Sequence, residues 1–318
     1  MSKTKIGLGL AALGRPEYIN IRDNNTHDKS QEAFMENAFS VLNFAYQHGI
    51  RYFDTAPSYG KGEEFLTNWN SKYKHEDVSL STKWGYTYVA NWELGFSGAH
   101  EVKEHSLEKL IEQWQVSKEL QPQLKIYQVH SATFESGVLE NKEVLKQLYE
   151  IKNQTSLQIG ITTSGTNQSE IIEAALKIKV EKEDLFDSYQ VTYNIFEQAT
   201  HPILKHLLQL NKTVIIKEAL ANGRIFKNEN FSHYKKLYVV IDSLAKKYRV
   251  GTDAIALRFV MDNLEPTYLL SGASSTGQLE QNIKAYSFKL DKEELQSLNS
   301  FKTDSQKYWK ERNVLSWN

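Results

Sequence analysis

Two patterns of apolar residues alternate along this chain from end to end, one typical of buried strands and one typical of amphipathic helices. Short apolar runs rich in β-branched residues predict buried strands at residues 6–10, 52–54, 79–83, 126–130, 157–162, 188–193, 214–217 and 268–271. Stretches with apolar residues three and four positions apart predict helices near 31–47, 63–69, 102–114, 143–151, 169–176, 203–210, 234–248, 253–261 and 278–286. Alternating strands and helices of this number favour an α/β fold, one closed parallel (β/α)8 TIM barrel.

The length of the chain admits either one large barrel or two smaller domains. A chain of 318 residues is at the upper edge of what one hydrophobic core serves. No Pro/Gly/Ser-rich linker interrupts it, so residues 1–318 are expected to form a single domain.

Two segments are longer than the loops of a minimal barrel, residues 87–101 and the tail 304–318. Both are rich in aromatic residues, namely Tyr88, Trp92 and Phe96 in the first and Tyr308, Trp309 and Trp317 in the second. Ordinary loop packing explains them, and so does a lid that selects the substrate at the C-terminal face, where barrel enzymes carry their sites.

The charge balance and the cysteine content of the chain limit the kinds of ligand and metal site that are expected. Lys+Arg number 38 against 39 Asp+Glu, so no broad attraction to nucleic acid or to an anionic membrane is expected, and a small ligand fits better. The absence of cysteine excludes disulfides, thiolate nucleophiles, iron-sulfur clusters and cysteine-type zinc sites. Oligomeric state does not follow from the sequence.

The first residues permit two interpretations. Lys3 and Lys5 precede the apolar run 6–13, which resembles the start of a signal peptide. The run is short and contains Gly7 and Gly9, and a first barrel strand explains it equally well. No later segment approaches the ~20 apolar residues of a membrane span, so the cytoplasm is the expected location.

Four ionisable residues fall at or just beyond the ends of three successive predicted strands: Asp54, Tyr59, Lys83 and His130. In a barrel they converge on one end. Tyrosine, with an ordinary pKa near ~10, is a poor acid unless a cation stabilises its phenolate, and a buried lysine needs a carboxylate to stay charged. Asp54, Lys83 and Tyr59 would form such a relay.

The motifs around these residues resemble those of the aldo-keto reductase family. They are Tyr52-Phe53-Asp54-Thr55-Ala56-Pro57-Ser58-Tyr59-Gly60, Ser81-Thr82-Lys83 and Gln128-Val129-His130. The likeness continues through Ile159-Gly160-Ile161, Gln190, Ala219-Leu220-Ala221-Asn222-Gly223 and Leu270-Ser271-Gly272-Ala273, with Gln278 and Asn282 beyond. It therefore covers nearly the whole chain.

This resemblance implies an NAD(P)-dependent oxidoreductase that moves hydride between NADP(H) or NAD(H) and a small carbonyl or sugar substrate. Tyr59 would donate the proton, Lys83 would lower its pKa, Asp54 would hold Lys83, and His130 would orient the carbonyl. The residues implied to bind cofactor are Thr162, Thr163, Gln190, Leu220, Asn222, Arg224, Gly272, Ser274, Gln278 and Asn282.

The chain departs from the family pattern at three places. Thr162 and Thr163 stand where relatives grip the carboxamide with a Ser-Asn pair, and a threonine hydroxyl cannot replace both groups of an amide. Lys217 stands on the seventh strand, where many relatives stack an aromatic ring on the nicotinamide, and its role is open. Asn222 and Arg224 lie where relatives wrap the pyrophosphate, and an exposed loop is the alternative interpretation.

The eighth unit bears on the choice between the two cofactors. Relatives that are specific for the phosphorylated nicotinamide cofactor commonly have Arg or Lys just after the Gly-Ala of this unit. Here Gly272-Ala273 is followed by Ser274-Ser275-Thr276, with no cation before Lys284. Because hydroxyls bond a phosphate oxygen or a free ribose hydroxyl equally, use of both forms is expected.

Two other motifs are weighed and set aside. Gly7-Leu8-Gly9-Leu10-Ala11-Ala12 fits a Rossmann phosphate turn, but Gly14-Arg15-Pro16 and the polar stretch 20–28 stand where its helix should begin. His100 and His105 resemble a helical zinc motif with one residue too many, which on a helix puts the imidazoles about 140° apart. No metal site is expected.

Two alternatives to the reductase remain on the same barrel. The first is a regulatory or scaffold barrel that binds the cofactor without turnover, and the second is an isomerase or lyase. The latter requires a phosphate site or metal-binding carboxylates that the sequence does not show. The sequence leaves the substrate and the direction of reaction undetermined.

Overall fold

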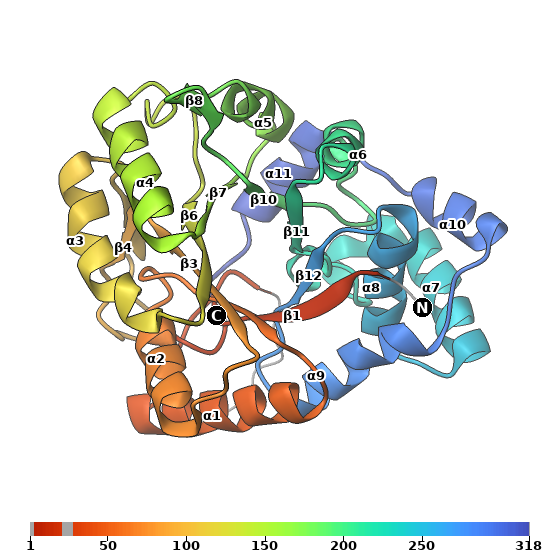
Figure 1. Ribbon diagram of the computed structural model, residues 1–318. Coiled ribbons are helices and arrows are strands. Elements are labelled where there is room, and N and C mark those ends of the chain that lie inside the picture. The colour runs from red at the N-terminus through yellow and green to blue at the C-terminus, as the bar shows by residue number, and fades with distance from the viewer. Residues whose placement is uncertain (1–2, 21–27, 318) are drawn as a thin grey trace.

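Eight parallel strands close into a barrel in the computed structural model, which describes residues 3–20 and 28–317 (Figure 1). The polar stretch expected at 20–28 lies almost entirely outside the described residues. The barrel strands are β1 (Lys5–Gly9), β2 (Tyr52–Asp54), β3 (Ser79–Trp84), β6 (Leu124–Val129), β7 (Gln158–Thr162), β10 (Ser188–Thr192), β11 (Thr213–Lys217) and β12 (Tyr268–Ser271). Their order is β1-β12-β11-β10-β7-β6-β3-β2, so the first and last strands pair and the predicted fold is confirmed.

Helices surround the barrel and cover its outer face (Figure 1). They are α1 (Gln31–Gln47), α2 (Gly62–Tyr73), α3 (Leu107–Ser117), α4 (Lys142–Thr155), α5 (Gln168–Leu176), α6 (His201–Gln209), α7 (Lys235–Tyr248), α8 (Thr252–Asn263), α9 (Thr276–Ile283), α10 (Lys292–Asn299) and α11 (Ser305–Asn313). Helix α1 shows why they begin where they do: the Ser30 side chain accepts from the amide of Ala33, and Val41 and Leu42 then bury its inner face. Short 3-10 turns η1 (Lys118–Leu120), η2 (Ala221–Gly223), η3 (Glu229–Tyr234) and η4 (Lys284–Ser287) complete the set.

Two of the predicted helices are corrected by the structure. The helix expected at 102–114 is α3 and begins only after Ser106, whose side chain accepts from the amide of Lys109. Residues 101–103 instead form β5 (Glu101–Lys103), paired antiparallel with β4 (Tyr86–Tyr88), and Val102 is half exposed there. The helix expected at 278–286 is α9, which ends at Ile283 and passes into η4. A second hairpin, β8 (Lys179–Val180) with β9 (Glu183–Asp184), and helix α10 were not predicted.

The inside of the barrel is filled by side chains in layers. Tyr52, Ile126, Ile215 and Leu270 form an apolar lower layer, with Tyr268 stacked on Tyr52 at a centroid distance of 3.9 Å. A Cβ on Gly7 would lie 2.6 Å from the Tyr52 ring, so this position of β1 has room only for glycine. Since alternate residues of a strand face the same side, Asp54 on β2, Gln128 on β6 and Lys217 on β11 also point inward, nearer the C-terminal ends of the strands. Those ends are called the mouth below.

Outward-facing strand residues pack against the helices in a continuous apolar core that includes Leu8, Phe53, Val129 and Leu257. Within the described residues, no helix is both long enough and apolar enough to cross a bilayer. The barrel thus holds the strand ends that surround the mouth in fixed positions.

Candidate active site

A buried ion pair occupies the upper inside of the barrel. Lys83 Nζ lies 2.5 Å from Asp54 Oδ2 and donates to the carbonyl of Thr55 at 2.9 Å, and the lysine is fully buried. The other carboxylate oxygen of Asp54 accepts from Ser81 Oγ, Gln128 Nε2 and Gln190 Nε2 at 2.6, 3.2 and 3.0 Å. Both charges therefore have hydrogen-bonding partners, which is what a buried ion pair requires. The predicted contact between Asp54 and Lys83 is present.

Tyr59 lies beside this pair, on the loop between β2 and α2. The ammonium of Lys83 is 4.7 Å from the centroid of its ring, and the ring meets that of His130 edge-on at 5.6 Å. Burial, followed by the carboxylate of Asp54, raises the pKa of Tyr59 well above its ordinary value. The net shift is upward because Tyr59 is removed from water and faces the Asp54 carboxylate, and the lowering effect expected of Lys83 stays a prediction.

His130 follows β6 directly and is nearly buried. Its Nδ1 lies 3.4 Å from Ser58 Oγ, and its carbonyl lies 2.9 Å from Nε2 of His105. Burial, and then the cations Lys83 and Lys217, lower the pKa of His130 well below its ordinary value. The imidazole is therefore neutral at physiological pH.

Arg15 is a member of the site that the sequence did not single out. It follows β1, is almost fully buried, and its guanidinium carbon lies 5.3 Å from the centroid of the Tyr59 ring. Its Nη1 donates to the carbonyl of Ser58 at 3.0 Å and forms a 2.5 Å ion pair with Glu101. Arg15 thus fixes the loop that carries Tyr59, yet no local pattern around it marks this role.

The three expected carboxamide ligands are engaged with protein groups. Thr162 Oγ1 accepts from the amide of Ser131 at 2.7 Å, and the buried Thr163 Oγ1 lies 3.4 Å from Gln168 Oε1. Gln190 points into the barrel and donates to Asp54. All three residues lie on or next to β7 and β10, and their side chains bond to other protein groups.

The turn after β11 holds Leu220, Asn222 and Arg224. Asn222 adopts a left-handed backbone (φ 55°) and donates to the carbonyl of Ile19, while its buried Oδ1 has no hydrogen-bond partner among the described residues. Arg224 is fully buried and donates to the carbonyls of Ala221 and Tyr308, so it anchors α11. Its role toward a cofactor stays a prediction.

The turn after β12 suits a phosphate-bearing ligand. Ser274 bonds to Gln278 Oε1 through its amide at 2.8 Å, and the amide of the nearly buried Asn282 contacts Ser271 Oγ. No atom lies within 4 Å of the place where a Cβ on Gly272 or Gly277 would be. Open space beside the first amides of a helix accommodates an anion, and the unpartnered Asn222 Oδ1 on the neighbouring unit offers an acceptor. The residues present therefore fit a dinucleotide cofactor.

The two long aromatic segments meet each other. The Trp317 ring of the tail stacks on the His100 ring at 4.2 Å, and Arg15 lies 4.9 Å from the centroid of Trp317. The end of the tail therefore covers Arg15 next to Tyr59. Two other aromatic residues of these segments have packing contacts. Trp92 contacts Phe34 of α1, and Trp309 is buried in the core. Asn318 lies outside the described residues.

Trp317→Ala is expected to change the ranking of substrates by about 10-fold in kcat/KM ratios, because one lost contact in a substrate site has an effect of this size. The cofactor Kd should stay within about twofold, since Trp317 contacts Arg15 and not the turn after β12. Steady-state kinetics on a substrate panel measure this, with the exposed Val314→Ala of the same tail as the control. An unchanged ranking would reduce the tail to packing. A truncation is less suitable, because it removes the ion pair between Arg312 and Glu218.

The two histidines of the near-zinc motif lie apart in function. Because residues 101–103 are a strand, the helical spacing considered for His100 and His105 does not apply. His105 bonds to the carbonyl of His130, while His100 lies 3.9 Å from a carboxylate oxygen of Glu17. Each has a structural partner.

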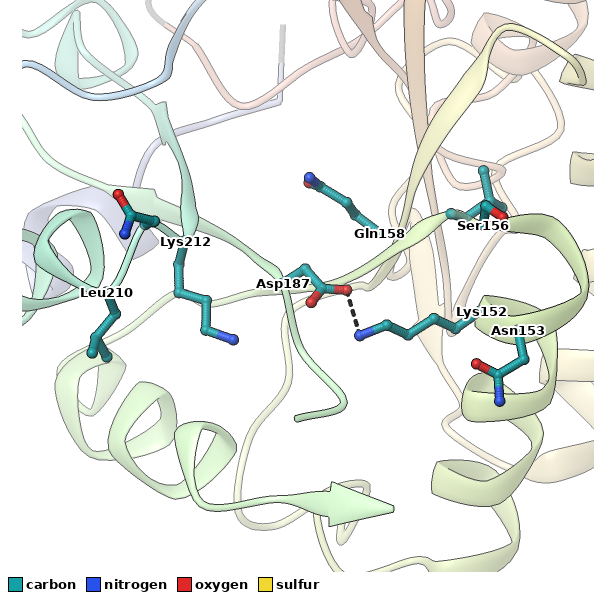
Figure 2. Close-up of a pocket in the computed structure, with 9 residues that line it drawn as sticks. Lys152, Asn153, Ser156, Gln158, Asp187, Leu210 and Lys212 are labelled. Carbon is teal, nitrogen blue, oxygen red and sulfur yellow. Dashed lines mark ion pairs between the residues drawn. The ribbon is translucent and has the colours of Figure 1, made fainter. Parts of the chain in front are cut away.

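A pocket of about 530 Å³ opens at the opposite end of the barrel from the mouth. Figure 2 shows Lys152 reaching Asp187, with Lys212 directed toward the same space. Gln158 begins β7, and Asp187 and Lys212 directly precede β10 and β11, so the pocket is at the N-terminal ends of the strands. Lys152 and Lys212 are paired with Asp187 and Asp184. The residues that line this pocket do not include Asp54, Tyr59, Lys83 or His130. Barrel enzymes carry their sites at the other end.

Comparison with known proteins gives a consistent result. The model of the aldo/keto reductase family matches residues 5–303. Aldo-keto reductase YhdN of Bacillus subtilis is 24% identical over 93% of this chain and 89% of its own. Among solved structures, glycerol dehydrogenase AKR11B4 from Gluconobacter oxydans superimposes with a TM-score of 0.70 at 19% identity, over 93% of this chain and 90% of that one. Aldo-keto reductase AKR11C1 from Bacillus halodurans, in its holo form, gives 0.67 at 20% identity, over 93% and 91%.

Proposed function

Because this chain belongs to the aldo-keto reductase family, we propose that it is an oxidoreductase that transfers hydride between NADP(H) or NAD(H) and a small carbonyl, aldehyde or sugar substrate. The observation that carries the proposal is the meeting of Asp54, Lys83, Tyr59 and His130 at one end of the barrel. When bound, the nicotinamide supplies or accepts the hydride. The residues of the chain supply the proton and the orientation.

Tyr59 is the proposed proton donor. Its raised pKa keeps the phenol protonated at physiological pH, so the proton is available when the substrate oxygen becomes basic on reduction. Lys83, 4.7 Å from the ring centroid, and Arg15, 5.3 Å from it, then stabilise the phenolate that remains. Asp54 holds Lys83 in place through their 2.5 Å contact.

His130 is proposed to orient the carbonyl. The lowered pKa keeps the ring neutral, and we assign Ser58 Oγ as the donor to Nδ1, 3.4 Å away, which puts the ring proton on Nε2. A neutral imidazole donates a hydrogen bond to the substrate oxygen without competing with Tyr59 as the acid.

Purified protein mixed with reduced cofactor and a panel of aldehydes and sugars tests the proposal. Loss of the absorbance of reduced nicotinamide, dependent on substrate, is the expected result. Cofactor binding without turnover on any substrate would favour the regulatory or scaffold barrel instead.

We also expect measurable use of both cofactors, because Ser274 offers hydroxyl and amide groups where a cation would select the 2′-phosphate. Ser274→Arg should tighten binding of the phosphorylated form by roughly 10- to 150-fold, as one charge-assisted hydrogen bond is worth about 1.5–3 kcal/mol. Fluorescence titration of both forms measures this, and Ser274→Gln controls for side-chain length. A wild-type preference above roughly 1,000-fold would mean that another cation reaches the phosphate.

A further inference from the structure

Lys217 lies in the mouth across from the catalytic residues. It is the last residue of β11 and follows the inward-facing Ile215 by two positions, so its side chain leaves the strand on the inner side of the barrel. In the closed order of eight strands, β11 stands opposite β3, which carries Lys83. Its ammonium donates to Ser164 Oγ, beyond the end of β7, at 2.6 Å. It therefore lies across the strand ends of β7, β10 and β11.

This ammonium is a cation without a carboxylate of its own. Arg312 is paired with Glu218 at 2.8 Å, and Lys83 with Asp54 at 2.5 Å. Among residues 3–20 and 28–317, no ion pair joins Lys217 to an acidic side chain, and only part of the side chain is exposed. The charged or titratable groups that act on it or that it acts on are Glu218 directly after β11, Arg312 of α11, Lys83 of β3, Asp54 of β2 and His130 after β6.

The position of the hydride-carrying ring follows from the chemistry. The carbon that receives the hydride bears the oxygen held by Tyr59 and His130, and reacting atoms must approach to about 3–3.5 Å. Tyr59, Lys83 and His130 belong to the β2, β3 and β6 side, whereas the open turn at Gly272 and Asn222 belongs to the β11 and β12 side. A nicotinamide extending from that turn to the substrate enters the mouth from the β11 and β12 side, and Lys217 is the last residue of β11.

We infer that Lys217 makes the protein bind the reduced cofactor, with its neutral ring, more tightly than the oxidised cofactor, with its positively charged ring. This rests on the proposed function, because it requires a nicotinamide at the mouth. The physical cause is repulsion between two like charges in a partly dry site, where screening by water is weak. An aromatic side chain at this position would lack that repulsion.

Tighter binding of the reduced form changes the equilibrium on the protein. By a thermodynamic cycle at fixed pH, the bound equilibrium between oxidised cofactor plus alcohol on one side and reduced cofactor, carbonyl and a released proton on the other shifts toward the carbonyl by the ratio of the two Kd values. Lys217 therefore favours substrate oxidation on the protein, although the equilibrium in solution is unchanged. This is a property of a dehydrogenase more than of a reductase.

The charge of Lys217 is sensitive to pH in an accessible range. Burial lowers the pKa of Lys217 to about 8, against the opposing effect of Glu218. Burial acts to raise the pKa of Glu218, but the opposing effects of Arg312 and Lys217 outweigh it and lower the pKa to about 2. Glu218 therefore stays ionised. The preference for the reduced form is therefore present below about 8 and is lost as pH rises through that value, since the neutral amine no longer repels the oxidised ring.

Calorimetric titration of wild type with NADH, NAD⁺, NADPH and NADP⁺ gives the ratio of oxidised to reduced Kd without turnover. Lys217→Met should lower this ratio at least about 10-fold at pH near 6.5, equivalent to about 1.4 kcal/mol. Lys217→Arg should keep the ratio and abolish its dependence on pH, because arginine does not titrate in this range. The exposed Lys236→Met, which removes the same charge from α7, should leave the ratio unchanged.

A ratio in Lys217→Met within about twofold of wild type would overturn the inference. So would a wild-type ratio that is constant between pH of about 6.5 and about 9.5, a measurement that needs no variant to fold. Failure of all four nicotinamides to bind wild type would overturn the proposed function as well. Binding of both redox states with equal affinity overturns only the role of Lys217.

Discussion

Tyr59→Phe is expected to lower turnover by at least ~100-fold, the usual contribution of a positioned general acid, while the cofactor Kd stays within about twofold. The substitution removes only the hydroxyl, and the ring keeps its contacts with His130 and with the ammonium of Lys83. Single-turnover measurement of hydride transfer checks it directly. Tyr73→Phe, which removes the same atom from an exposed ring on α2, is the matched control and should behave as wild type.

The pH profile of wild type sharpens this test. The pKa of Tyr59 is raised well above 10.0 and that of His130 is lowered well below 6.5, so neither group changes charge between these values. Neither group should therefore give hydride transfer a pH dependence across that interval, and a change near pH 8 would belong to Lys217. Full turnover in Tyr59→Phe would mean that another group is the general acid.

Lys83→Met is expected to have two effects of different origin. It leaves the carboxylate of Asp54 buried without its cation, and breaking a buried pair in this way costs about 3–5 kcal/mol of unfolding free energy. It also removes the cation beside the Tyr59 ring, so turnover should fall at least ~100-fold. Denaturant unfolding and single-turnover kinetics measure the two effects separately.

The double variant Asp54→Asn/Lys83→Met distinguishes stability from catalysis. An amide at position 54 is neutral and still accepts from Ser81 and Gln190, so much of the lost stability should return. Turnover should remain low because the cation is still absent. An unfolding free energy within about 0.5 kcal/mol of wild type in Lys83→Met alone would contradict the buried pair as described.

The barrel and the four proposed catalytic residues follow from local patterns. Buried parallel strands are short, continuous apolar runs between helices, and all eight were located within two residues of their ends. Asp54, Lys83 and His130 terminate such runs, and parallel strands in a barrel end on one side. Their convergence is therefore a consequence of order along the chain.

Other features of the site depend on partners that no local pattern specifies. Arg15 reaches the Tyr59 loop and Glu101, 86 residues away, from a Gly-Arg-Pro sequence that reads only as a turn. Arg224 belongs to a motif implied to bind cofactor, yet its guanidinium is used by Tyr308 and Glu311 of α11. Residues 101–103 carry an apolar position that suits a helix, but pairing with β4 makes them a strand.

The sequence by itself determined the fold and the end of the barrel at which the proposed catalytic residues meet, because the order of apolar runs and helical patterns fixes those along the chain. Only the tertiary structure decided which polar groups pair with one another. Gln190 donates to Asp54 while Lys217 donates to the Ser164 hydroxyl, although both point into the same barrel. The physical reason is that a hydrogen bond depends on distances of a few tenths of an ångström between strands far apart in sequence, and strand register and closure set those distances.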